Sequence, residues 1–100
     1  MKFGLQSVRT INQTGQFKRD LKREAKGKHH ATLEDSLMPV LAALAADDPL
    51  PPRHSDHPLT GDLKDFRDCH VKPNLVLIYQ KPDDDTLLLV RIGSHAELGL

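Results

Sequence analysis

The stretch from Asp56 to Tyr79, DHPLTGDLKDFRDCHVKPNLVLIY, decides which fold we expect. Its polar part carries two histidines and four aspartates, and its last five residues are typical of a strand. From Phe66 onward, alternate side chains would leave opposite faces of a strand, so Asp68 and His70 share one face. Lys72-Pro73-Asn74 favours a turn. We therefore predict two antiparallel strands, at Phe66–Val71 and Leu75–Lys81.

A third strand is predicted after this pair. Pro82-Asp83-Asp84-Asp85 favours a second turn, and Thr86–Ile92 is another run of strand-forming residues. The strand Leu75–Lys81 is apolar without alternation over most of its length. This pattern indicates burial on both faces and a central position in the sheet.

The first third of the chain predicts a strand and a helix. Ser7–Asn12 alternates weakly between polar and apolar residues, as an edge strand does. Thr14 is a good N-cap, and Gly27 would end the helix that follows. We expect His29 and His30, in the loop after this helix, to be exposed to solvent. One apolar stripe of the helix is formed by Phe17, Leu21 and Ala25.

A second helix is predicted before Asp47-Asp48-Pro49, and its start is ambiguous. Thr32 could cap it, with Asp35 near the capping-box position, but Pro39 would then lie inside the helix at a cost of about 3 kcal/mol or with a kink. Alternatively, Ser36 is the N-cap and Pro39 lies in the first turn, where proline is tolerated. The apolar stripe consists of Leu33, Leu37, Val40, Leu41 and Leu44.

These elements predict a single α+β domain over residues 1–100. The order of one strand, two helices and a meander gives a small antiparallel sheet of three to four strands, with the two N-terminal helices packed on one face. One hundred residues suffice for one domain and are too few for two. A chain of this length buries a modest core, so a partner protein could complete it.

The composition excludes several classes of protein. No apolar run approaches the roughly 20 residues of a membrane helix, and no signal-peptide core follows Met1. The single cysteine, Cys69, cannot form an internal disulfide, which suits the cytoplasm, and we expect it to fill the core as a small apolar residue. The chain has no Gly-rich phosphate loop, no nucleophile elbow and no dinucleotide fingerprint.

The formal net charge of zero hides an asymmetry along the chain. Residues 1–30 carry eight Lys or Arg and two acids, whereas residues 31–100 carry six Lys or Arg and twelve acids. Lys18, Lys22 and Lys26 repeat along one side of the first predicted helix. This basic surface could face phosphates or an acidic partner protein, or it could simply be a solvated helix face.

Three histidines and one acid could act together on a phosphate. Asp68 and His70 leave one strand face about 7 Å apart at their Cα atoms, so the carboxylate could orient the imidazole. His57 precedes them in a loop, and His95 follows the last strand. Two imidazoles can serve as base and acid across one phosphate near neutral pH.

Other roles are possible for the same residues. Arg67 and Arg91 are candidate phosphate clamps, although the strand period places Arg67 opposite His70. Asp68 could also pair with either arginine. A metal site would draw two ligands each from His54-x-x-His57 and Asp68-x-His70, but neither motif has an established zinc spacing, and we expect no metal.

Several motifs of the chain resemble those of a known toxin family. They are Asp56-His57-Pro58-Leu59, Gly61, Phe66-Arg67-Asp68-Cys69-His70-Val71, Pro73, Leu77-Ile78-Tyr79 and Gly93-Ser94-His95-Ala96, with Thr14-Gly15-Gln16-Phe17 at the start of the first helix. This set is similar to the signature of the YafQ branch of the RelE-type bacterial toxins. The similarity covers about residues 9–98.

This resemblance implies a RelE-like fold and a cytoplasmic mRNA interferase without a cofactor. Such an enzyme cleaves mRNA in the ribosomal A site and is silenced in a complex with a cognate antitoxin. In the reaction that the resemblance implies, a ribose 2′-OH of the mRNA attacks the adjacent phosphate. The resemblance implies that either His70 or His95 takes the 2′-OH proton, and that another histidine protonates the 5′-oxygen leaving group.

The resemblance also implies roles for the other candidate residues. Asp68 would orient an imidazole, and His57 and Arg91 would hold or neutralise the phosphate. Apart from the resemblance, Arg67 and Asn74 are candidate substrate contacts. The chain departs from the family pattern at Asn74, where the pattern has an acid. It departs again at Leu98-Gly99-Leu100, where the pattern has an aromatic residue. The alternative is a non-catalytic toxin or binding module of the same fold, for example one that targets gyrase, which has no use for the histidine set.

Overall fold

A computed structural model describes residues 8–100 of the chain. Two short 3-10 turns, Pro52–His54 and Gly61–Leu63, flank the short strand at His57–Pro58. No helix within these residues is long and apolar enough to cross a membrane. The regular elements, in chain order, are β1 (Thr10–Gln13), α1 (Gly15–Lys26), α2 (Leu33–Ala45), β2 (His57–Pro58), β3 (Arg67–Lys72), β4 (Leu75–Gln80), β5 (Thr86–Gly93) and α3 (His95–Leu98).

The five strands form one mixed sheet in the order β1-β5-β4-β3-β2. The antiparallel pairs β3–β4 and β4–β5 confirm the predicted meander, and β4 is the central strand, as its apolar run indicated. The predicted count of three to four antiparallel strands is wrong in two respects. The two-residue strand β2 adds to one edge, and β1 pairs with β5 in parallel at the other.

The edge strand begins later than the sequence indicated. It spans Thr10–Gln13 rather than Ser7–Asn12, and Ser7 lies outside the described residues. Its pairing with β5 stops at the register pair Gln13 and Leu89. The chain then turns into α1, which follows the remaining part of β5.

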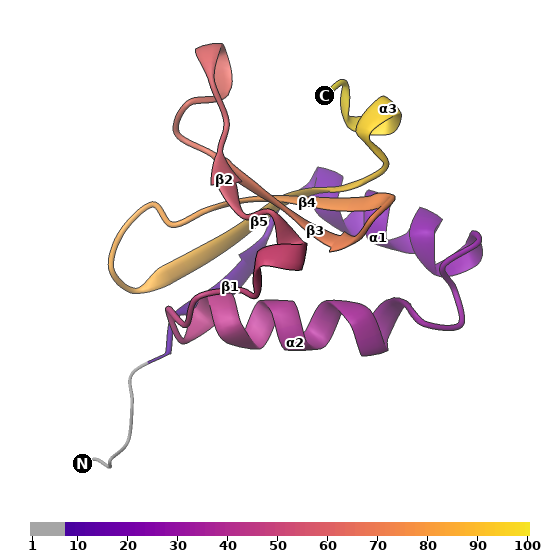
Figure 1. Cartoon of the computed structure of the whole chain (residues 1–100), viewed down its shortest axis with the longest axis horizontal. Helices are drawn as coiled ribbons and strands as arrows, with labels where there is room; N and C mark the ends of the chain where they lie inside the picture. The colour runs from indigo at the N-terminus through magenta and orange to yellow at the C-terminus, as the bar shows by residue number, and fades with distance from the viewer. Residues whose placement is uncertain (1–7) are drawn as a thin grey trace.

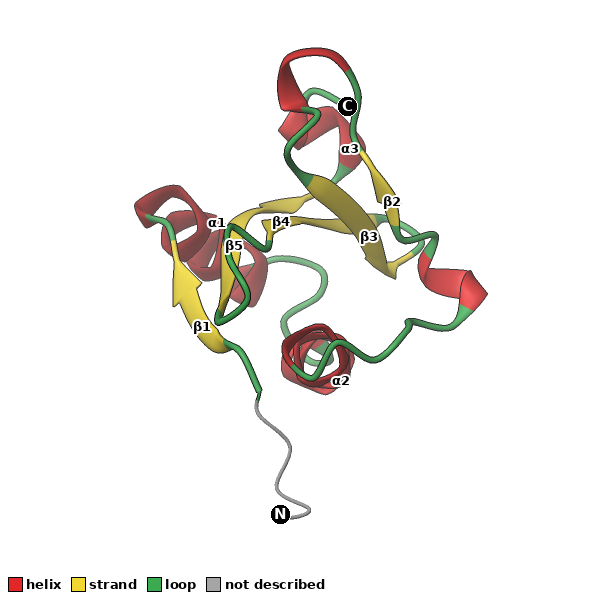
Figure 2. Cartoon of the chain, turned by 90° about the vertical axis from the view of Figure 1, so that its left-hand side faces the viewer, coloured by secondary structure: helices red, strands yellow, loops and turns green. Residues whose placement is uncertain are grey.

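The two N-terminal helices do not pack on the sheet in the same way, which corrects the prediction that both lie on one face. Helix α2 covers one face of the sheet, below it in Figure 1, whereas α1 runs beside β5. Asp20 and Arg23 of α1 bond the backbone N–H and C=O of Ile92, so α1 protects the part of β5 that β1 leaves unpaired. A third helix, α3, was not predicted, and Figure 2 shows it on the side of the sheet away from α2.

The core lies between α2 and the sheet. Its members include Phe17 of α1, several apolar residues of α2, and alternate residues of β3, β4 and β5. Cys69 is one of them and is fully buried, which confirms its expected role, and burial raises the pKa of its thiol to about 12. The thiol therefore stays protonated and unreactive near neutral pH.

Helix α2 begins at Leu33, so Pro39 does lie inside it. Thr32 precedes the helix but does not cap it with its side chain; its hydroxyl instead accepts a hydrogen bond from the Lys72 ammonium. Burial of the apolar stripe offsets the missing hydrogen bond of Pro39, because each buried leucine or valine contributes about 1.5–3 kcal/mol. All five residues of this stripe, Leu33, Leu37, Val40, Leu41 and Leu44, are buried.

His29 is buried, which contradicts its predicted exposure, whereas His30 is exposed. The ring of His29 lies beside Lys72, with 3.3 Å between its Nδ1 and Nζ. Burial and the nearby ammonium both lower the pKa of His29. The neutral ring can therefore accept a hydrogen bond from Lys72, and this contact ties the loop between α1 and α2 to the end of β3.

Thr14 is the N-cap of α1, as predicted, and it also ties the helix to the sheet. Its Oγ1 accepts from the Phe17 amide at 2.9 Å and donates to the Val90 carbonyl at 2.7 Å. We expect Thr14→Ala to lower the free energy of unfolding by about 1–2 kcal/mol, since it removes both bonds. Urea denaturation measures this change. Thr14→Ser keeps the hydroxyl and should cost far less; equal losses for the two variants would contradict the role of the hydroxyl.

Candidate active site

The sheet register gathers the candidate residues on the face opposite α2. His57 on β2 is the cross-strand partner of Asp68 on β3. The cross-strand partner of Asp68 on β4 is Ile78, and the partner of Ile78 on β5 is Arg91. Side chains of directly opposed residues leave the same face of a sheet, so this row carries His57, Asp68 and Arg91 together.

A second row lies next to the first and carries His70. This residue pairs with Val76 on β4, and Val76 pairs with Gly93 at the end of β5. Val76 and Ile78 are both buried on this face and form an apolar floor between the polar residues. In Figure 2, the segment between β2 and β3 and helix α3 both rise from this side of the sheet.

His57 lies against Asp68 and is held there by the backbone. Its Nε2 is 3.2 Å from Asp68 Oδ1, and its Nδ1 is 2.5 Å from the Ser55 carbonyl oxygen. Each ring nitrogen of His57 therefore faces an oxygen atom. The Asp68 side chain is buried, whereas half of the His57 side chain is exposed. This geometry places a half-exposed imidazole at the surface, oriented by a buried carboxylate.

His57 and Asp68 are in close contact, but the contact is not aligned as a hydrogen bond. Asp68 Oδ1 is buried and has no hydrogen-bond partner among the described residues. Asp68 forms no ion pair with Arg67 or Arg91, its two possible partners in the sequence analysis, because these arginines pair with other aspartates. The carboxylate is therefore directed to His57.

His70 and His95 face each other over the second row. Their ring centroids are 5.0 Å apart, and the ring planes meet at 74°. His95 is the first residue of α3, which begins directly after β5. A capping box fixes this start: Ser94 Oγ accepts from the Glu97 amide, and Glu97 Oε1 accepts from the Ser94 amide at 2.8 Å. The two imidazoles are close enough to contact one phosphate group.

Arg91 belongs to the site face but binds a residue of α1. Its Nε and Nη2 donate to the two carboxylate oxygens of Asp20, at 2.7 and 3.1 Å. The Asp20 side chain is fully buried, while that of Arg91 is 31% exposed. The arginine is thus held in one orientation at the boundary with solvent.

Two other predicted site residues lie apart from the histidines. Arg67 is on the alternate face of β3, as its position in the strand period indicated, and its Nε lies 3.3 Å from both Asp56 Oδ1 and Tyr79 Oη. Asn74, in the turn between β3 and β4, borders a hollow together with Ser94 and Glu97. Ser94, which lines this hollow, directly precedes His95 in the chain.

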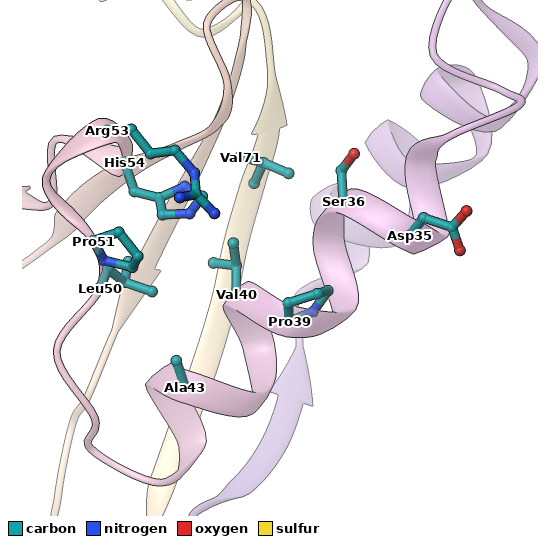
Figure 3. Close-up of a pocket in the computed structure, with 10 residues that line it drawn as sticks. All are labelled: Asp35, Ser36, Pro39, Val40, Ala43, Leu50, Pro51, Arg53, His54 and Val71. Atoms are coloured by element: carbon teal, nitrogen blue, oxygen red, sulfur yellow. The ribbon is translucent and has the colours of Figure 1, made fainter.

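His54 supports the site, a role that the sequence did not indicate. It is buried, and its Nδ1 donates to the His70 carbonyl at 2.6 Å, at the edge of β3 that the short β2 leaves unpaired. Figure 3 shows Arg53 and His54 facing Val40 and Val71 across a hollow between this segment and α2. Among residues 8–100, no three His, Cys, Asp or Glu side chains converge as metal ligands.

Asp20 was not among the candidates, although the sequence held a signal for it. Phe17, Asp20 and Glu24 are spaced as one helix face, and all three are buried. An acid on the buried face of a helix needs partners to stabilise its charge. The pattern therefore indicated a buried ion pair but not its partner, which lies 71 positions later.

The fold is that of small bacterial toxins whose structures are solved. A metal-bound toxin from Helicobacter pylori is 47% identical, with a TM-score of 0.81, and the match covers 91% of this chain and 99% of that one. The Escherichia coli DinJ-YafQ complex matches with 37% identity and a TM-score of 0.77, over 90% of this chain and 97% of that one.

Sequence comparisons agree with these structures. The mRNA interferase toxin YafQ of Escherichia coli K12 is 39% identical over 90 residues, which are 90% of this chain and 95% of that protein. The model of the YafQ family, described as a bacterial toxin of a type II toxin-antitoxin system, matches residues 9–99. The chain belongs to the YafQ toxin family.

Proposed function

We propose that this chain is an mRNA interferase, an endoribonuclease that cleaves mRNA in the ribosomal A site by histidine acid-base catalysis. The observation that carries this proposal is the pair of His70 and His95, with ring centroids 5.0 Å apart on one face of the sheet. The names of the Escherichia coli relatives, mRNA interferase toxins, support the same activity. A toxin that acts only by binding has no need for two opposed imidazoles.

The proposed reaction transfers two protons and exchanges one bond at phosphorus. One imidazole of the pair takes the proton of the ribose 2′-OH, whose oxygen then bonds to the adjacent phosphorus. The bond from phosphorus to the 5′-oxygen breaks, and the other imidazole donates a proton to that oxygen. The products are a 2′,3′-cyclic phosphate and a 5′-hydroxyl. The distance between the two rings does not distinguish base from acid, so either ring fits either role.

The remaining site residues would stabilise the charge on the phosphate. Arg91, oriented by Asp20, places a cation on the site face, and His57, oriented by Asp68, would contact the phosphate. Fixed cations where negative charge develops lower the barrier without a cost of reorganisation. Asn74, beside Ser94, could donate a hydrogen bond to the RNA. The proposal gives Arg67 no substrate contact, because its side chain lies on the other face with Asp56 and Tyr79.

Two partners complete the proposal. The solved DinJ-YafQ complex supports a cognate antitoxin for this chain. The ribosome is the second partner, because a chain with no net charge binds free RNA only weakly through electrostatic attraction. The exposed lysines of α1 are available to either partner.

A cell-free translation extract tests the activity. Purified protein should cut a translated reporter message and leave the same message intact when its start codon is removed. The fragments should carry 2′,3′-cyclic phosphate and 5′-hydroxyl ends. His30→Ala is a matched control and should cut like the wild type, because His30 is exposed and its ring contacts only the Gly27 carbonyl among residues 8–100. An intact translated message would contradict the activity, and 5′-phosphate ends would contradict the 2′-OH mechanism.

A further inference from the structure

Asp20 has an unusual number of partners for a residue outside the histidine set. It lies in the middle of α1, is fully buried, and accepts hydrogen bonds from five donors. Two come from Arg91, and one each from Gln16 and Arg23 at 3.1 and 3.2 Å. The fifth comes from the Ile92 amide at 3.2 Å. A carboxylate with this many donors is fixed in position, and it fixes its donors in turn.

The contact with Asp20 leaves one side of Arg91 free. Its Nε and Nη2 face the carboxylate, while Nη1 has no hydrogen-bond partner within residues 8–100. A guanidinium is planar, so a carboxylate on one edge determines the direction of the remaining N–H groups. Arg91 is in register with Ile78 and Asp68, so its side chain leaves the sheet on the face that carries the histidines.

The same carboxylate connects α1 to the helix that bears His95. Arg23 donates to Asp20 through Nη1 and to the Ile92 carbonyl through Nη2, and its Nε lies 3.3 Å from Glu97 of α3. Glu97 is the residue whose side chain closes the capping box at Ser94. A Cβ on Gly93 would come within 2.8 Å of Arg23 Nη2, so the glycine leaves room for this arginine.

We propose that Asp20 is a positioning residue of the nuclease site: it holds Arg91 so that the free end of the guanidinium meets a phosphate oxygen of the RNA. This inference rests on the proposed function. Asp20 itself does not touch the substrate. It acts on the reaction through Arg91, and through Arg23 it steadies the start of α3.

A double-mutant cycle on cutting rate tests this assignment. We expect Asp20→Asn to lower kcat about 10–100-fold, because a misplaced group costs up to about 100-fold, and Arg91→Gln to lower it about 100-fold. If Asp20 acts through Arg91, the double variant should be little slower than Arg91→Gln alone. Asp47→Asn is the control: Asp47 also pairs with two cations, Arg9 and Lys81, but not at the site, so cutting should stay at the wild-type rate.

A second variant removes any dependence on how well the Asp20 variant folds. Arg91→Lys keeps the charge but cannot bond both carboxylate oxygens and still present a fixed donor. We expect it to lose nearly as much kcat as Arg91→Gln. A near wild-type rate for Arg91→Lys, or losses for Asp20→Asn and Arg91→Gln that multiply in the double variant, would overturn the inference. Absence of cutting by the wild type would instead overturn the proposed function itself.

Discussion

His70→Ala and His95→Ala should each lower the rate of message cutting about 100–10,000-fold, the usual contribution of one acid or base to a proton transfer. The two rings lie 5.0 Å apart and would act on one phosphate, so the double variant should be only slightly slower than either single variant. Single-turnover cutting of a programmed ribosome measures these rates. His30→Ala serves as the unaffected control.

The pH dependence of cutting should separate the roles of the two histidines. A base and an acid acting together give a bell-shaped profile, whose acidic limb reports the base and whose alkaline limb reports the acid. Each single variant should lose one limb, and the limb that disappears identifies the role. His95 is exposed, so His95→Ala should leave the free energy of unfolding almost unchanged. A rate loss that follows unfolding, or a wild-type rate in either variant, would contradict the catalytic pair.

Asp20→Asn should lower the free energy of unfolding by about 2–3 kcal/mol. Removing one partner of a fully buried ion pair costs about 3–5 kcal/mol. Here we expect a smaller loss, because the side chains of Arg91 and Arg23 are 31% and 41% exposed and can be solvated by water in the variant. Urea denaturation at pH 7 measures the change. Asp47→Asn, at an exposed ion pair, should cost less than about 1 kcal/mol.

The cost of Asp20→Asn should also depend on pH. Burial alone would raise the pKa of Asp20, but hydrogen bonds from Arg91, Gln16 and the Ile92 amide outweigh it and place the pKa below its ordinary value. A carboxylate with a lowered folded-state pKa stabilises the protein above its unfolded pKa of about 3.9 and loses that contribution as the pH falls further. The difference between wild type and variant should therefore be constant from pH 5 to 8 and shrink below about pH 4. A difference that grows in acid would contradict this assignment.

Periodicity and local chemistry in the sequence determined much of this fold. The alternation at Asp68 and His70 predicted their shared face, the apolar run of β4 predicted its central place, and Thr14 and Gly27 marked the ends of α1. These features depend on residues within a few positions of one another. The same local reasoning placed Arg67 on the opposite face and Cys69 in the core.

Other features were decided only by the tertiary structure. The parallel pairing of β1 with β5, the burial of His29 and His54, and the bond between Asp20 and Arg91 all join residues far apart in the chain. A sequence pattern shows that Asp20 lies on a buried helix face, but which cation meets it depends on where α1 packs against β5. Local preferences set the elements of this protein, and long-range packing chose which charges and rings they bring together.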